Sequence, residues 1–185
     1  SRLRDERART LLSDAQQRSQ LLCKDAPVPL VLQPGCFDVI AEIKKRSPAE
    51  GTLDTALVTT TQQADAYVQG GAVALSVLTE PEQFCGTLDD LHEIVEHVRT
   101  VPVMRKDFLV SRYQVREARL AGASGVLLIA AILNTGQLTA MLDAALELNM
   151  FVLLEVFDRA DLDKAVPILE HCGPALDANG RCNYL

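Results

Sequence analysis

Short apolar runs alternate with amphipathic stretches from residue 39 to residue 171, and this alternation limits the fold more than any other feature of the chain. The apolar runs have the length of strands and are rich in Val, Ile or Leu, at residues 39–43, 73–78, 101–104, 125–129 and 151–156. The stretches with helical spacing follow them, at residues 60–69, 88–99, 113–121, 137–149 and 159–171. Such alternation predicts parallel strands joined by right-handed crossovers. Five units fit either an open doubly wound sheet or part of a (βα)8 barrel, and periodicity alone does not choose between them.

The ends of several predicted helices carry residues that are typical of helix caps. Thr87 and Asp158 stand where N-caps are expected, because their side chains accept hydrogen bonds from the first turn. Gly70-Gly71 and Gly122 follow helices and precede strands, where a left-handed C-cap is expected. These signals support the helix boundaries drawn from the spacing.

The segments outside the alternating region divide the chain into two predicted parts. Residues 1–38 are predicted to form an N-terminal helical extension, with a helix at about residues 2–22, and a connector that contains proline. Residues 39–185 are predicted to form a partial (βα) barrel domain. After His171 the pattern fades, Asn179-Gly180 indicates a turn, and residues 183–185 are expected to start a sixth strand.

Composition and charge exclude several classes of function. Hydrophobic residues make up 48% of the 185 residues and charged residues 23%, which is typical of a globular protein. The net charge of 18 − 25 = −7 argues against nucleic acid or an anionic membrane as the partner, but allows a small anionic substrate. No apolar run approaches the roughly 20 residues of a membrane span, and the first residues do not resemble a signal peptide.

The cysteines and histidines indicate neither a disulfide framework nor a metal site. The five cysteines form no C-x-x-C pair, which favours reduced thiols in a cytoplasmic protein. The three histidines lack the spacing of a helical metal pair, so no metal is expected.

Ionisable residues at the ends of apolar strands are the strongest functional signal. Glu42 and Lys44 share one face of the first strand with Ile40, while the small apolar residues of the other face should meet the helices. Glu155 shares one face of the fifth run with Leu153, and Lys106 follows the third run. Ligands of parallel α/β proteins bind at the carboxyl ends of strands, so these four residues are candidates for one catalytic site. The alternative interpretation is a set of structural ion pairs.

Several further residues are predicted to line the same site. Ser47-Pro48 lies in a polar loop after the first strand, and Ser76 lies on the second strand. Phe84 and Phe108 follow the second and third strands in polar loops, where apolar rings suit a flat aromatic ligand. A plain strand–helix connection and rings that cap the core are the competing interpretations.

Five ordered motifs between residues 39 and 158 resemble the indole-3-glycerol phosphate synthase family. They are Val39-Ile-Ala-Glu-Ile-Lys-Lys-Arg-Ser-Pro-Ala-Glu-Gly51, Ala74-Leu-Ser-Val-Leu-Thr-Glu80 with Phe84-Cys-Gly86, Pro102-Val-Met-Arg-Lys-Asp-Phe108 with Tyr113-Gln114, Gly125-Val-Leu-Leu-Ile129 and Leu153-Leu-Glu-Val156. Residues 1–38 match only in position, as the family's helical extension.

The resemblance implies a (βα)8 TIM barrel enzyme of tryptophan biosynthesis, a carboxy-lyase. Such an enzyme converts 1-(2-carboxyphenylamino)-1-deoxyribulose 5-phosphate to indole-3-glycerol phosphate by ring closure, decarboxylation and dehydration, without metal or organic cofactor. It further implies that Lys106 is a general acid, Glu155 a base, Lys44 a substrate-binding residue and an acid of the dehydration, and Glu42 the residue that orients the lysines. Phe84, Phe108, Pro48 and Leu127 would wall the aromatic ring, with Ser76 and Ser47 nearby.

The family's motifs of strands six to eight have no counterpart in these 185 residues, so the chain is expected to form an incomplete barrel of about five βα units. We therefore expect little or no synthase activity from the 185 residues alone, and apolar interior faces that are exposed. The expected partner is a phosphorylated small molecule, with neither nucleic acid nor membrane, and fusion to or association with other tryptophan-pathway enzymes stays open. A non-catalytic half-barrel that binds a partner chain and another phosphosugar barrel enzyme, such as an isomerase, are the alternative hypotheses.

Overall fold

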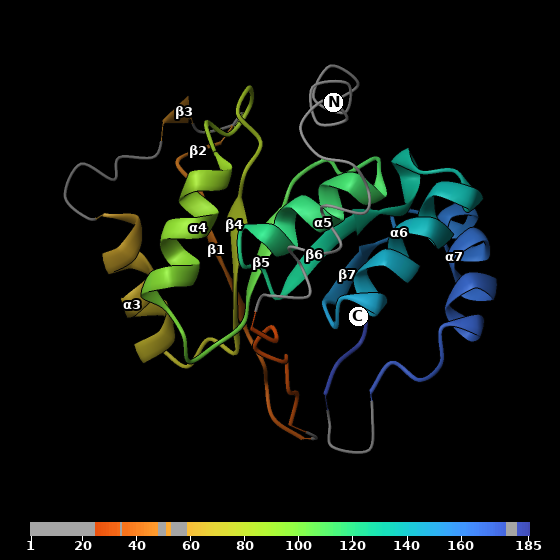
Figure 1. Cartoon of the computed structure of the whole chain (residues 1–185), viewed down its shortest axis with the longest axis horizontal. Coiled ribbons are helices and arrows are strands. Elements are labelled where there is room, and N and C mark those ends of the chain that lie inside the picture. The colour runs from red at the N-terminus through yellow and green to blue at the C-terminus, as the bar shows by residue number, and fades with distance from the viewer. Residues whose placement is uncertain (1–24, 34, 48–50, 53–58, 177–180) are drawn as a thin grey trace.

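A five-stranded parallel sheet with helices packed along one face forms the body of the computed structural model (Figure 1). The structure describes residues 25–33, 35–47, 51–52, 59–176 and 181–185. The expected helix at residues 2–22, Pro48 and the expected turn at Asn179-Gly180 lie outside the described residues. None of the helices in the described ranges is long and apolar enough to cross a membrane.

The order of the strands in the sheet decides between the two architectures that the sequence left open. The strands are β1 (Ile40–Ile43), β4 (Ala74–Leu78), β5 (Val103–Lys106), β6 (Gly125–Ile129) and β7 (Phe151–Glu155). They lie in the order β1-β4-β5-β6-β7, and every neighbouring pair is parallel. In a doubly wound sheet the order reverses at a switch point, whereas here it follows the chain throughout, as in a (βα)8 barrel.

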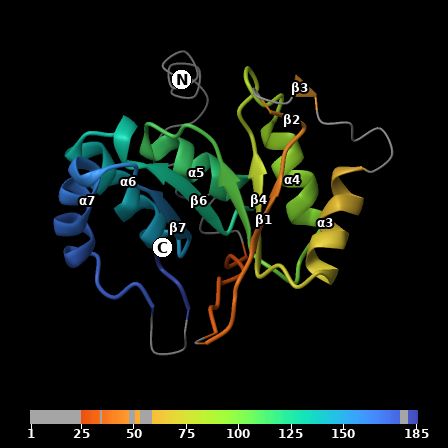
Figure 2. The same ribbon diagram turned by 180° about the vertical axis from the view of Figure 1, so that it is seen from behind.

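Each strand leads into a helix, and the helices lie side by side over the sheet (Figures 1 and 2). They are α3 (Thr60–Gln69), α4 (Leu88–His97), α5 (Arg112–Leu120), α6 (Thr135–Glu147) and α7 (Arg159–His171), with a 3-10 turn, η1 (Ala130–Ile132), ahead of α6. The polar loop after β1 contains two short antiparallel strands, β2 (Arg46–Ser47) and β3 (Gly51–Thr52). All five predicted strand–helix units are therefore present.

The predicted helix caps agree with the structure at most positions. The side chains of Thr87 and Asp158 accept hydrogen bonds from backbone N–H groups of the first turns of α4 and α7. Gly71 and Gly122 have φ angles of +88° and +98°, the left-handed conformation that glycine adopts without strain. Gly70 is itself right-handed helical, so only the second glycine of that pair has the expected conformation.

The third predicted strand was placed two residues too early. The apolar pattern suggested residues 101–104, but β5 spans Val103–Lys106 and therefore includes Arg105 and Lys106. Charged residues stop an apolar pattern in the sequence. Within the sheet both side chains form ion pairs, which offset the cost of placing charges on a buried strand.

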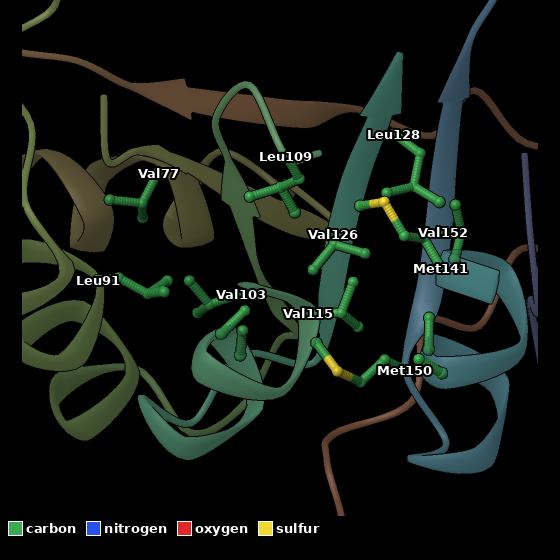
Figure 3. Close-up of a cluster of buried hydrophobic side chains, with 14 of the residues drawn as sticks. Val77, Leu91, Val103, Leu109, Val115, Val126, Leu128, Met141, Met150 and Val152 are labelled. Carbon is green, nitrogen blue, oxygen red and sulfur yellow. The ribbon is translucent and has the colours of Figure 1, made fainter. Parts of the chain in front are cut away.

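The main core lies between the sheet and its helices. Alternate residues of the strands, such as Val77, Val126 and Val152, point to side chains from the helices, such as Leu91 and Met141 (Figure 3). On β1 this face carries Ala41 and Ile43, as expected from the alternation. The small apolar residues of β1 thus pack against the helices, and Ile40 and Glu42 lie on the opposite face of the sheet.

The opposite face of the sheet was expected to expose apolar side chains, and within the described residues this is wrong for most of them, while Ile40 and Leu153 are partly exposed. Met104, Leu127 and Phe151 are buried there in a second cluster, against Leu30 of the connector and Cys182 near the last residue. The backbone N–H of Cys182 donates to the carbonyl of Leu30, 2.7 Å away. The connector and the last residues lie together at the end of the sheet that is lowest in both views (Figures 1 and 2).

The last residues of the chain continue the sheet beyond β7. Tyr184 forms a parallel bridge with Val152, and the N–H of Leu154 donates to the carbonyl of Leu185 at 2.9 Å. A strand start at residues 183–185 was predicted, and these contacts confirm it. Since this segment pairs with β7, the last strand in the order, the strand order of the sheet still follows the chain.

Candidate active site

The four charged residues predicted to be catalytic lie at the same edge of the sheet. Lys106 is the last residue of β5, Glu155 is the last residue of β7, and Lys44 directly follows β1. Glu42 lies two residues before Lys44 and shares its face. Because all the strands are parallel, their carboxyl ends meet at one edge.

Glu42 joins the two lysines. Its Oε1 lies 3.2 Å from Nζ of Lys44, and its Oε2 accepts a hydrogen bond from Nζ of Lys106. Partial burial alone would raise the pKa of Glu42, but the hydrogen bonds and positive charges of Lys106 and Lys44 outweigh burial and hold the pKa below its ordinary value. Glu42 is therefore an ionised carboxylate that holds two ammonium groups near each other.

A cavity of about 180 Å³ opens beside this ion-pair cluster at the carboxyl ends of β4 to β7. Its walls combine apolar and charged side chains, namely Leu78, Glu80, Phe84, Lys106, Asp107, Phe108, Leu127, Ile129 and Glu155. Lys106 and Glu155 thus reach the same pocket from β5 and β7, although β6 lies between those strands. Two aromatic rings and two aliphatic side chains of β6 could hold a flat apolar group between an ammonium and a carboxylate.

The predicted binding residues are divided between the cavity and its surroundings. Phe84, Phe108 and Leu127 line the cavity. Ser76 is buried on β4 directly opposite Glu42 in the register, and Ser47 is buried on β2. Neither serine is part of the cavity wall. Glu42 and Lys44 are not part of it either: Glu42 contacts Lys106 of the wall, and Lys44 contacts Glu42.

Two acidic residues of the cavity wall, Glu80 and Asp107, were not predicted as site residues. The Glu80 carboxylate accepts hydrogen bonds from the backbone N–H groups of Glu82, Gln83 and Phe84, at 3.0, 2.6 and 3.2 Å. Glu80 therefore shapes the loop that carries the Phe84 ring. Asp107 accepts from Arg105 and from Thr79. Glu80 and Asp107 follow the ends of β4 and β5 in the sequence, and this position was the signal that could have identified them.

A second cavity, of about 290 Å³, lies at the opposite ends of the strands. Residues 25–28 of the connector and the loops before β5 and β6 line it between α4 and α5. The predicted catalytic and binding residues are absent from its wall. Among the described residues no three His, Cys, Asp or Glu side chains gather in a way that could hold a metal ion. The candidate active site is therefore the cavity at the carboxyl ends.

The fold and the pocket together define a (βα) barrel protein whose site lies at the carboxyl ends of its parallel strands. Among solved structures, a 3-keto-L-gulonate-6-phosphate decarboxylase from Vibrio cholerae has a TM-score of 0.52 at 14% identity, covering 72% of this chain and 59% of its own. A pyruvate carboxylase from Rhizobium etli has a TM-score of 0.55 at 12% identity, covering 85% of this chain and 22% of its own. At such identities the likeness concerns the fold alone. The chain belongs to the indole-3-glycerol phosphate synthase family, whose model matches residues 3–171.

Relatives in this family share close to half of their aligned residues with the chain. An indole-3-glycerol phosphate synthase from a Nocardioides species is 48% identical over 130 residues, which are 70% of this chain and 49% of the relative. The synthase from Mycobacterium leprae is 44% identical over 146 residues, 76% of this chain and 53% of the relative. That from a Parafrankia species is 41% identical over 157 residues, 85% and 58%. The chain thus spans about half the length of the curated relatives it matches.

Proposed function

We propose that this chain carries catalytic residues of an indole-3-glycerol phosphate synthase. The substrate would be 1-(2-carboxyphenylamino)-1-deoxyribulose 5-phosphate, and the products indole-3-glycerol phosphate, carbon dioxide and water. Family membership supports the proposal, and so does the arrangement of Lys106 and Glu155 around one partly aromatic cavity. That arrangement is the observation on which the proposal depends.

In the first step an aromatic carbon of the substrate attacks the ketone carbon and closes the five-membered ring. Negative charge then develops on the ketone oxygen, and a proton from Nζ of Lys106 neutralises it. Loss of carbon dioxide from the same aromatic carbon returns the bonding electrons to the ring. Phe84, Phe108 and Leu127 would hold the ring flat against the wall, since these side chains supply the apolar surface of the cavity.

The second step removes water from the closed ring. The hydroxyl leaves with a proton from Lys44, and Glu155 takes the proton that is lost as the double bond forms. Glu42 would hold the ammonium groups of Lys44 and Lys106 in place between turnovers, as its two contacts indicate. Ser47 on β2 and Ser76 on β4 would contribute to substrate binding close to these charged residues. Pro48, which lies outside the described residues, is proposed to contact the substrate ring.

The experiment uses the chain extended to the length of its relatives and a substrate labelled in the carboxyl group. Release of labelled carbon dioxide reports ring closure and decarboxylation, while indole fluorescence reports the completed product. Lys106→Ala should slow both signals by about 10²- to 10⁴-fold, the usual contribution of a general acid. In a single turnover at saturating enzyme, Lys44→Ala should slow the fluorescence more than the release of carbon dioxide, because the acid of the second step is lost while the acid of the first step, Lys106, is kept.

Arg99→Ala is the matched control, because it removes an exposed cation at the far end of the sheet, in the segment that precedes β5. Both rates should stay unchanged in this variant. Undiminished activity of Lys106→Ala would exclude Lys106 as the general acid, and equal slowing of the two signals in Lys44→Ala would exclude its separate role. The 185 residues alone, assayed in parallel, should show little or no turnover.

A further inference from the structure

Arg105, the residue before Lys106, is a buried charge on the helix side of the sheet. Neighbouring residues of a strand point to opposite faces, so Lys106 faces the cavity while Arg105 faces the layer between β5 and α5. Its side chain is 2% exposed, and the side chain of its partner Asp107 is equally buried. The catalytic proposal gives neither of them a chemical role.

The guanidinium of Arg105 donates to three different elements. Nε donates to Oγ1 of Thr79, which follows β4, at 3.0 Å, and Nη2 donates to Oδ2 of Asp107 at 2.9 Å. Nη1 donates to the carbonyl of Gln114 at 3.1 Å and to Oε2 of Glu117 at 2.8 Å, both on α5. One side chain thus ties the end of β4, the end of β5 and the first turns of α5 together.

Asp107 carries this network to the wall of the cavity. Its Oδ2 also accepts from the hydroxyl of Thr79 at 2.7 Å, and its Oδ1 accepts from the backbone N–H of Phe108 at 2.8 Å. Lys106 therefore stands between two residues, Arg105 and Asp107, whose side chains hold each other on the far side of the strand. The backbone on both sides of Lys106 is fixed from behind the sheet.

We propose that Arg105 is a positioning residue, which sets the place of the Lys106 ammonium and the Phe108 ring by clamping Asp107 and Thr79. The inference rests on the proposed function of the cavity. Proton transfer needs the donor within hydrogen-bond reach of the substrate, and a displacement of about 1 Å can cost about 10²-fold in rate. A rigid strand end beneath Lys106 meets that requirement.

The chemistry of the side chain favours this role over simple filling of the core. Taking an ion pair out of water gives little or no net stability compared with apolar side chains of the same volume. The planar fork of arginine, in contrast, holds partners in several fixed directions at once, which a lysine ammonium on a flexible stem does not. The four contacts of Arg105 run in different directions and depend on this property.

The first test examines the strand end without any substrate, in the 185-residue chain. Arg105→Lys keeps the positive charge but loses the fork, so hydrogen exchange at the Phe108 amide, followed by NMR, should accelerate by at least about tenfold. The rate at which an acylating reagent modifies Lys106, followed by mass spectrometry, should change as well. Leu138→Ala is the control. It removes a buried side chain of α6 and so lowers stability, but it leaves the hydrogen bonds of Arg105 and Asp107 in place.

The second test measures kinetics in the chain extended to the length of its relatives. For Arg105→Lys we expect kcat to fall by about 10²-fold with KM changed by less than about threefold, because a misplaced acid weakens the transition state more than substrate binding. Leu138→Ala should leave kcat within about twofold at a temperature where both variants are folded. Arg105→Met serves as the more drastic variant where it folds.

The outcomes separate this inference from the proposed function. Unchanged exchange at Phe108 in Arg105→Lys, or a kcat that falls no further than in Leu138→Ala, would overturn the positioning role. Faster exchange with an unchanged kcat would overturn it too, since the clamp would then have no effect on catalysis. Full activity of Lys106→Ala would instead refute the proposed function, while the exchange result at Phe108 would still be read from the same variants.

Discussion

The Glu42 carboxylate accepts a hydrogen bond from the Lys106 ammonium although β4 lies between their strands. In the register Glu42 is opposite Ser76 of β4, and Lys106 is opposite Leu78 two residues further along. The two side chains therefore meet diagonally above β4, at the edge where the cavity opens. A small residue at position 76 leaves room for this contact, and the pair connects the first and third strands of the sheet.

The lowered pKa of Glu42 predicts how this pair contributes to stability at different pH values. Since the folded pKa lies below the ordinary value of 4.5, the contribution is present above that value and is lost as pH falls through the folded pKa. Glu42→Gln should therefore unfold more easily than the parent near neutral pH, and the difference should shrink in acid. Urea unfolding between about pH 3 and about pH 7 measures it. A difference that stays constant over this range would contradict the prediction.

Gly86 should not tolerate a side chain, because the chain passes too close to the end of β4. A Cβ at this position would lie 2.0 Å from the backbone carbonyl oxygen of Leu78, which cannot move without disturbing the strand. Gly86→Ala should therefore lower the free energy of unfolding by about 1–3 kcal/mol. The matched control is Gly136→Ala in α6, where the nearest atom is 3.5 Å away and the helix should gain about 0.5–1 kcal/mol. Urea unfolding of both variants checks the contrast, and equal effects would refute it.

Gly125 makes room for the ring of Phe151 on the inner face of the sheet, the face opposite the helices. A Cβ on Gly125 would lie 2.5 Å from two ring atoms of Phe151, its cross-strand neighbour on β7. Gly125→Ala should destabilise the fold by about 1–3 kcal/mol, and adding Phe151→Leu should relieve part of that loss. A double-mutant cycle should show a coupling of about 0.5–3 kcal/mol. Additive effects would mean that the clash is relieved elsewhere.

The cysteines should differ in reactivity according to burial. Burial raises the pKa of the Cys182 thiol to about 11, so the reactive thiolate is scarce at neutral pH. Cys36 and Cys85 are exposed. Iodoacetamide applied to the native protein should label these two and leave Cys182 unlabelled, while urea should make all three react at similar rates. Peptide mass spectrometry gives the sites, and native labelling of Cys182 at the rate of Cys36 would show that the last residues detach from Leu30.

Much of the fold follows from local patterns. The five strand–helix units and the caps at Thr87 and Asp158 could be predicted because each depends on a few neighbouring residues. The same holds for the faces of β1, since side chains of a strand alternate. The end of β5 was misplaced because the pattern treats Arg105 and Lys106 as polar residues, while the sheet provides partners for both.

The sequence predicted which residues belong to the candidate site better than it predicted the contacts between them. Alternation and strand ends pointed to Glu42, Lys44, Lys106 and Glu155, and Phe84 and Phe108 line the cavity. Glu80 and Asp107 were missed because a single acidic letter after a strand does not reveal the backbone groups that it binds. Ser47 and Ser76 are buried without lining the cavity, which the pattern of the sequence does not reveal.

The sequence by itself determined the class of the protein: a parallel α/β chain with opposite charges at the carboxyl ends of its strands. Only the tertiary structure decided that the strands follow chain order, that Leu30 and Cys182 cover the inner face, and that Glu42 meets Lys106 across β4. The physical reason is the distance along the chain between the residues that interact. Strands, helices and caps arise from interactions within a few residues, whereas these contacts join segments that only register and packing bring together.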